Sequence, residues 1–97
     1  MQKSTNSINT FIVFCDETRL KVLELLQSGE KSASSLLKQV CVGQSTLSHH
    51  MKVLAESGII NVRKVGKWAY YSIREGGGQK AIEMLKRLTN TEYIKTH

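Results

Sequence analysis

The sequence predicts a mainly α-helical fold that carries one β-hairpin. Apolar residues recur at helical spacing up to residue 57, and between Ile59 and Ile73 this spacing changes to alternation. Three consecutive glycines, 76–78, then separate the hairpin from a last amphipathic segment. A chain of 97 residues is expected to form one domain over residues 1–97, with a core so small that a second subunit would help to cover it.

The chain is expected to begin with a flexible arm and two helices. Residues 1–7 are mostly polar and lack the apolar stretch of a secretory signal. Residues 8–15 are apolar enough for a short helix. Asp16 is a good N-cap for a second helix that runs through Ser28, and Gly29 is expected to end that helix in the left-handed conformation.

The leucines of this second helix predict its buried side. Leu20, Leu23 and Leu26 recur at helical spacing, which is typical of a helix that packs on a core. We therefore interpret this helix as scaffold. Its polar residues are expected on the solvent side: Arg19, Lys21, Glu24 and Gln27.

Two further helices are predicted to form a helix-turn-helix. Ser32 is the expected N-cap of a short helix over residues 33–40, and a longer helix is expected over residues 44–57, where Gly58 stops it. Only residues 41–43 connect them, and a short turn that contains glycine is typical of this motif.

The remaining elements are a hairpin and a final helix. Residues 59–73 are predicted to form the hairpin, because they alternate and are rich in aromatic and branched residues, with Gly66 at the turn. A hairpin directly after a helix-turn-helix predicts a winged helix-turn-helix, with residues 59–73 as the wing. The last helix is expected over residues 79–93, with an apolar stripe of Ile82, Leu85 and Leu88.

The charge of the chain favours a polyanionic partner. Fourteen Lys and Arg against eight Asp and Glu give a formal net charge of +6 and a pI near 9.6. Nucleic acid is preferred to an anionic membrane, because no segment is clearly a basic helix with a broad apolar face. No apolar run approaches the roughly 20 residues of a membrane span. We therefore expect a cytoplasmic protein.

The outer side of the helix over residues 44–57 predicts contact with duplex DNA. Leu47 and Leu54 belong to its apolar side, whereas the opposite side is polar and short-chained. The major groove, about 12 Å wide, admits one helix whose exposed groups hydrogen-bond base edges and phosphates. An ordinary solvated helix surface is the alternative. The candidate DNA-binding residues of this helix are Gln44, Ser45, Thr46, Ser48, His49 and Lys52.

The wing adds a cluster of positive charge next to that helix. Arg63, Lys64 and Lys67 lie around its turn, and they are interpreted as contacts with DNA phosphates. Residues 44–74 hold five Lys and Arg against one acidic residue, Glu56, and so carry +4 of the total charge. A basic hairpin alone is weak support, because hairpin turns are often rich in lysine.

Residues 16–26, 44–59 and 66–73 resemble, in order, three signature stretches of the ArsR/SmtB family of bacterial repressors. The resemblance covers roughly residues 11–75. It implies a homodimeric repressor that binds double-stranded DNA at an inverted repeat, with residues 44–54 as the recognition helix. It also implies that the first and last helices form the dimer interface, for which the candidates are Phe11, Phe14, Ile82, Leu85 and Leu88.

The chain departs from that family at the metal sites. Metal-binding members carry Cys-Val-Cys where this chain has Ser32-Ala-Ser34, and serine hydroxyls are poor ligands for soft metals. The last helix offers only Glu83 and Glu92 and no histidine, and His97 stands alone at the end of the chain. We expect no metal site and no cofactor, and the sequence does not identify an effector.

The two cysteines and two of the histidines leave other interpretations open. Cys15 and Cys41 are expected to be reduced and buried, with a redox sensor as the alternative. His50 is expected to pack inward, whereas His49 is expected on the DNA side. An enzyme is disfavoured, because Ser48 and His49 are helix neighbours without an orienting carboxylate. The alternatives to a repressor are a winged-helix module for protein interaction and a positive regulator.

Overall fold

The computed structural model describes residues 10–90. The predicted arm over residues 1–7 and the last part of the predicted final helix, residues 91–93, lie outside them. A helical turn at residues 10–12 precedes the other elements. These are α2 (Glu17–Leu26), β1 (Lys31–Ser32), α3 (Ala33–Gln39), α4 (Gln44–Glu56), β2 (Ile60–Val65), β3 (Trp68–Ile73) and α5 (Gln79–Thr89).

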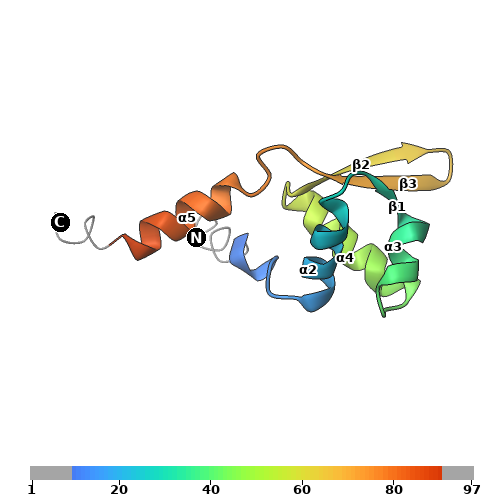
Figure 1. The fold of residues 1–97 in the computed structure, drawn as a ribbon, viewed down its shortest axis with the longest axis horizontal. Coiled ribbons are helices and arrows are strands. Elements are labelled where there is room, and N and C mark those ends of the chain that lie inside the picture. Colours follow the sequence, from blue (N-terminus) through green and yellow to red (C-terminus); the bar gives the residue numbers. More distant parts are fainter. Residues whose placement is uncertain (1–9, 91–97) are drawn as a thin grey trace.

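The core lies between α2, α3 and α4, which form one compact body (Figure 1). Val22, Leu36 and Leu54, one from each helix, are fully buried at its centre. The residues after α4 close the core, because Ile59 and Ile60 are also buried. Two caps begin helices as predicted: the side chain of Asp16 accepts a hydrogen bond from the Arg19 amide, and Ser32 accepts one from the Ser35 amide.

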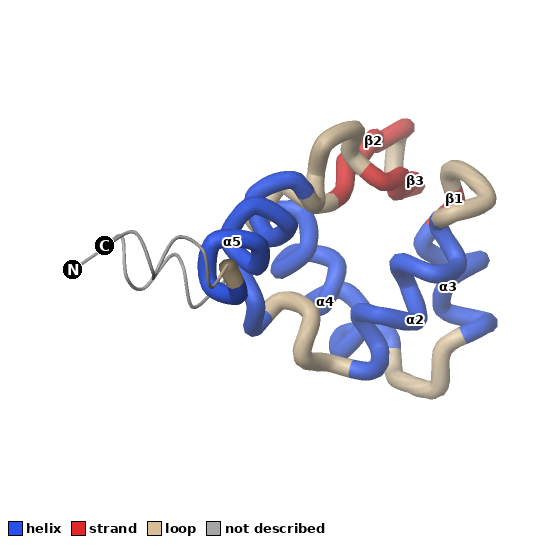
Figure 2. The backbone as a smooth tube through the Cα atoms, turned by 60° about the vertical axis from the view of Figure 1, so that its left-hand side comes forward, coloured by secondary structure: helices blue, strands red, loops and turns tan. Residues whose placement is uncertain are grey.

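The sheet has three antiparallel strands in the order β1-β3-β2. The hairpin pairs from Ile60 opposite Ile73 to Val65 opposite Trp68. Gly66 has a φ of +61° and occupies the first position of the two-residue turn, a conformation that glycine adopts without strain. The hairpin lies along one edge of the helical body (Figure 2), so the predicted mainly α fold with a β-hairpin is confirmed.

A tight joint connects the wing to α5. The Arg74 amide donates to the Ile59 carbonyl at 2.9 Å, and a Cβ atom at Gly77 would lie 2.8 Å from that carbonyl oxygen. Only glycine therefore fits at position 77. Beyond this joint α5 leads away from the body (Figure 1).

The structure corrects two expectations for α2. Leu20 was expected in the core, but it is 45% exposed, because the buried stripe is centred on Val22 and Leu26, and a residue two positions from Val22 lies on the opposite side of a helix. Arg19 was expected in solvent, but it is half-buried beside α4. Over residues 10–90, no helix is both long and apolar enough to cross a membrane.

Candidate nucleic-acid interface

Helix α4 has one buried side and one exposed polar side. Leu47, Met51 and Leu54 face the core. All six candidate DNA-binding residues of this helix are exposed, and the hydrogen bonds described for residues 10–90 include none from their side chains. The exposed donors and acceptors therefore form one polar, nearly uncharged surface: Gln44, Ser45, Thr46, Ser48, His49 and Lys52.

The N-terminal end of α4 adds backbone donors to that surface. Gly43 is the N-cap and makes no side-chain capping hydrogen bond. The first hydrogen bond of the helix runs from the Leu47 amide to the Gly43 carbonyl at 3.0 Å. The amides of the first turn are consequently unbonded within the helix, and such amides attract phosphate oxygens.

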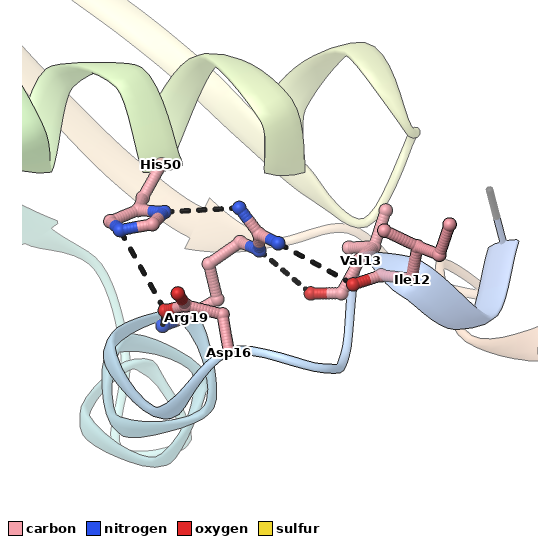
Figure 3. A network of polar contacts seen from close by, with 5 residues as sticks. All are labelled: Ile12, Val13, Asp16, Arg19 and His50. Carbon is pink, nitrogen blue, oxygen red and sulfur yellow. Dashed lines mark hydrogen bonds and ion pairs between the residues drawn. The ribbon is translucent and has the colours of Figure 1, made fainter.

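A polar network fixes α4 to the segment before α2 (Figure 3). The Arg19 guanidinium donates through Nη1 to His50 Nδ1 at 3.0 Å, through Nε to the Val13 carbonyl at 2.8 Å and through Nη2 to the Ile12 carbonyl at 3.4 Å. Because arginine has only donors, His50 Nδ1 must accept, and its Nε2 lies 3.7 Å from Asp16 Oδ1. His50 thus packs inward, as expected, and positions α4 against α2.

The carboxylate of Asp16 is stabilised in its charged form. The hydrogen bond from the Arg19 amide, more than any other contact, lowers the pKa of Asp16 below its ordinary value of 3.8. The helix cap and the network therefore share one anionic group.

The wing presents two lysines without an ion-pair partner among the described residues. Lys64 and Lys67 are both exposed on either side of Gly66. The Lys67 ammonium lies 5.9 Å from the centre of the Trp68 ring, and Trp68 is itself 53% exposed. The tip of the hairpin therefore combines positive charge with an exposed aromatic ring.

Arg63, the third predicted phosphate contact, is engaged within the chain. Its Nη2 and Nε donate to the two carboxylate oxygens of Glu30 at 2.7 and 3.0 Å. The guanidinium also lies over the Tyr70 ring, 4.7 Å from its centre. Hydrogen bonding to Glu30 raises the pKa of Arg63, and hydrogen bonding to Arg63 lowers the pKa of Glu30, so both groups are held in their charged forms.

A groove joins the helix surface to the wing. It has a volume of about 330 Å³ and lies between α3, α4 and the start of β3. Ser48 of α4 and Lys67 of the turn both line it, with Gln44 and Trp68. Residues far apart in the sequence thus meet in one continuous surface, which is suited to contact both base edges and phosphates.

The predicted dimer residues form a second surface at the other end of the molecule. On α5, Ile82, Leu85 and Leu88 are 47%, 54% and 61% exposed. Phe11 and Phe14 are only partly exposed, and Phe14 packs against the core. A cavity of about 530 Å³ separates residues 10–14 from the start of α5. Ile12 was not among the predicted interface residues, and it is 49% exposed on this surface.

The expectation of buried cysteines is wrong. Cys15 and Cys41 are both free and exposed. Cys15 lies in the turn after residues 10–12, where its thiol donates to the Phe11 carbonyl at 3.4 Å, and Cys41 lies in the turn between α3 and α4. Turns run over the surface, which accounts for the exposure of both thiols.

The serines at the positions of the family's metal-binding cysteines make local hydrogen bonds. Ser32 caps α3, and its hydroxyl lies 3.3 Å from that of Ser34. Within residues 10–90, no three His, Cys, Asp or Glu side chains are arranged to hold a metal ion. The rings of His49 and His50 are 5.9 Å apart at their centres, with His49 on the exposed side of α4.

Comparison with known proteins places the chain among transcriptional regulators. Residues 16–62 match the family described as bacterial regulatory protein, arsR family. An HTH-type transcriptional regulator of Methanocaldococcus jannaschii is 32% identical over 89 residues, which cover 91% of this chain and all of that protein. The biofilm growth-associated repressor of Xylella fastidiosa is 31% identical over 93 residues, covering 95% of this chain and 82% of that protein.

A solved structure agrees with these sequence relationships. The transcriptional activator HlyU of Vibrio cholerae is 29% identical over 87 residues, covering 90% of this chain and 81% of that protein. Its structure matches this one with a TM-score of 0.69 over 90% of this chain and 95% of that chain. The chain therefore belongs to the ArsR family of DNA-binding transcriptional regulators and has its winged helix-turn-helix fold.

Proposed function

We propose that the chain is a homodimeric repressor that binds an inverted repeat in duplex DNA. The observation that supports this most directly is the groove at which the polar surface of α4 meets the lysines of the wing. One part of that surface can hydrogen-bond bases, and the other can neutralise phosphates. In this proposal α4 enters the major groove and the wing follows the backbone.

The proposed DNA contacts fall into two groups, base contacts and phosphate contacts, according to the chemistry of the side chains. Ser48 and His49 carry hydrogen-bonding groups and little charge, so they are proposed to read base edges together with Gln44, Ser45 and Thr46. Lys52, Lys64 and Lys67 carry charge that is not paired in the described part of the chain, so they are proposed to contact phosphates.

The dimer is proposed to form through α5 and the residues before α2. The exposed stripe of Ile82, Leu85 and Leu88 supports this, since apolar stripes of this kind commonly pack on another helix. A two-fold dimer would place two α4 helices about 34 Å apart, in successive major grooves of an inverted repeat.

Repression is proposed in preference to activation, although relatives of both kinds exist. The Xylella fastidiosa relative is named a repressor, and it matches more of this chain than the activator of Vibrio cholerae does. A regulator of this kind needs no catalytic group, and we propose that the chain is not an enzyme and acts in the cytoplasm.

Two substitutions test the division of contacts. DNA sites are first selected from a random duplex pool, and binding to a selected site is compared with binding to random duplex. Ser48→Ala is expected to cost about 1–3 kcal/mol on the selected site and little on random DNA. Lys64→Gln is expected to weaken both equally and to reduce the magnitude of the slope of log K against log salt concentration by about one per protomer, or about two per dimer.

Control variants for this test lie elsewhere on the chain. Ser57→Ala removes a hydroxyl at the far end of α4, where Ser57 Oγ bonds the Val53 carbonyl, and Lys21→Gln removes an exposed charge from α2. Both are expected to leave DNA binding unchanged. A Lys64→Gln protein with altered sequence preference, or a Ser48→Ala protein weakened equally on all DNA, would show that helix and wing have been assigned the wrong roles.

A thiol response is a second candidate function, supported by the exposure of both cysteines. Cys41 lies two residues before the N-cap of α4, so a modification there would displace the start of that helix. If Cys41 is a sensor, peroxide is expected to weaken DNA binding. Cys41→Ser is expected to abolish this response, whereas the comparison variant Cys15→Ser is expected to keep it. Equal responses in all three proteins would exclude it. Zinc, cadmium and arsenite are expected to leave binding unchanged, since Ser32 and Ser34 replace thiolates.

A further inference from the structure

Arg63 and Glu30 form a two-pronged ion pair across the sheet. Both oxygens of the Glu30 carboxylate accept from the guanidinium, at 2.7 and 3.0 Å. This parallel geometry fixes direction as well as distance, and arginine provides it whereas lysine does not. An isolated exposed ion pair contributes little, but this two-pronged geometry is the exception in which the pair holds its partners in place.

The pair connects all three strands of the sheet. Glu30 directly precedes β1, Arg63 belongs to β2, and β3 runs between them. In the register, Tyr70 of β3 is opposite Ser32 on one side and opposite Arg63 on the other. Directly opposed residues share one side of a sheet, so the arginine side chain crosses over Tyr70, 4.7 Å from the ring centre, to reach Glu30.

This arrangement distinguishes Arg63 from the lysines of the wing. Its charge is opposed by a carboxylate at hydrogen-bonding distance, so that pair adds no net charge to the surface. Lys64 and Lys67 have no such partner in residues 10–90. A phosphate could take the Nε and Nη2 edge of Arg63 only by displacing Glu30, whereas it meets no competing carboxylate at the two lysines.

We propose that Arg63 is a positioning residue of the wing and not a phosphate contact. Together with Glu30 and Tyr70 it holds the hairpin against β1, and it leaves Lys64 and Lys67 to contact DNA phosphates. The phosphate contacts of Lys64 and Lys67 rest on the proposed function, whereas the positioning role of Arg63 does not. The two roles are therefore tested by separate measurements.

The first measurement needs no DNA. Trp68 is the only tryptophan of the chain and lies at the tip of the wing, paired with Val65. Time-resolved fluorescence anisotropy of Trp68 therefore reports motion of the wing. Glu30→Gln, Arg63→Gln and Arg63→Lys are each expected to increase the amplitude of its fast motion. The double variant that combines Glu30→Gln with Arg63→Gln is expected to show no more motion than either of these single variants, because each change breaks the same contact. Lys64→Gln, which removes the neighbouring charge, is the matched control.

The second measurement is the salt dependence of binding to a random-sequence duplex of 30 base pairs. Arg63→Gln is expected to weaken binding by a similar factor at every salt concentration and to leave the slope unchanged. Lys64→Gln and Lys67→Gln are each expected to reduce the magnitude of the slope by about one per protomer, or about two per dimer. The Glu30→Gln, Arg63→Gln double variant keeps the net charge and is also expected to keep the slope.

Distinct results overturn each half of the proposal. If Trp68 moves no more in Arg63→Gln than in Lys64→Gln, the pair does not position the wing. If Arg63→Gln reduces the magnitude of the slope as much as Lys64→Gln does and Arg63→Lys restores it, Arg63 is a phosphate contact. If the wild-type protein does not bind the duplex, the proposed function fails, while the fluorescence result still decides the role of the ion pair.

Discussion

Helices α4 and α5 are both amphipathic, yet the chain covers their apolar sides to very different extents. Helix α4 buries Leu47, Met51 and Leu54 against the core. Helix α5 buries only Met84 and exposes the remaining stripe, of which Leu88 is 61% exposed. The apolar side of α4 is thus covered within the molecule, whereas that of α5 is left exposed in the described part of the chain and would be covered in the proposed dimer. We infer that α4 depends on the fold for its stability and that α5 depends on assembly.

The largest expected effect contrasts one leucine from each helix. Leu54 is fully buried, so Leu54→Ala is expected to lower the free energy of unfolding by about 2–5 kcal/mol. Leu88→Ala is expected to change it by less than about 0.5 kcal/mol at low protein concentration, where monomers prevail. Urea unfolding at two protein concentrations measures both. Comparable losses at low concentration would contradict the contrast, because they would mean that α5 is packed within the monomer.

The next effect concerns assembly. Leu85→Asp places a charge in the exposed stripe and is expected to weaken the dimer by about thirty-fold or more, the cost typical of a central interface residue. Arg87→Gln makes the same change in net charge two positions along, on the opposite side of the helix, and is the control. Sedimentation at micromolar concentration measures the dimer. A wild-type protein that sediments only as a monomer would refute the proposed role of α5.

The smallest effect concerns the starts of the helices. Helices α4 and α5 begin at glycines without a side-chain cap, whereas α2 begins at Asp16. Asp16→Ala is expected to cost about 1 kcal/mol at pH 7. Because folding lowers the pKa of Asp16 below 3.8, its charge stabilises the fold above that pH, and this contribution is lost as the pH falls through the lower folded value.

A control variant separates the charge of Asp16 from its capping hydrogen bond. Asp16→Asn keeps an oxygen acceptor and removes the titration, so unfolding measured between pH 5 and pH 3 is expected to depend less steeply on pH than in the wild type. An unchanged dependence would assign the acid sensitivity to other carboxylates.

Short-range patterns in the sequence predicted most of the fold. The helix expected over residues 44–57 is Gln44–Glu56, and the hairpin expected over residues 59–73 contains both β2 and β3. These elements were predictable because their periodicity repeats several times within one segment. Strand β1 was not, since two residues carry no period and its pairing depends on a strand much later in the chain.

The candidate site was predicted only in part. The exposure of the α4 surface follows from helical spacing, and the structure agrees with it. The ion pair of Glu30 and Arg63 joins residues 33 positions apart, and the contact of Arg19 with His50 joins residues 31 apart, so no local pattern indicates either. The contacts of the α4 surface and the wing with DNA stay predictions. Glu30 was the missing signal for Arg63, because the arginine guanidinium matches the two oxygens of a carboxylate.

The close backbone approach at Gly77 has a consequence for how a protein of this design can diverge. The direction in which α5 leaves the body is set by the close approach of Gly77 to the main chain of Ile59, and no Cβ atom fits at position 77. The apolar stripe lies further along and is independent of that joint. In the proposed dimer, changes in the stripe would alter which copies pair, whereas a larger residue at position 77 would tilt α5 and with it the distance between the two α4 helices. The spacing of the operator would therefore depend on one glycine as well as on the interface.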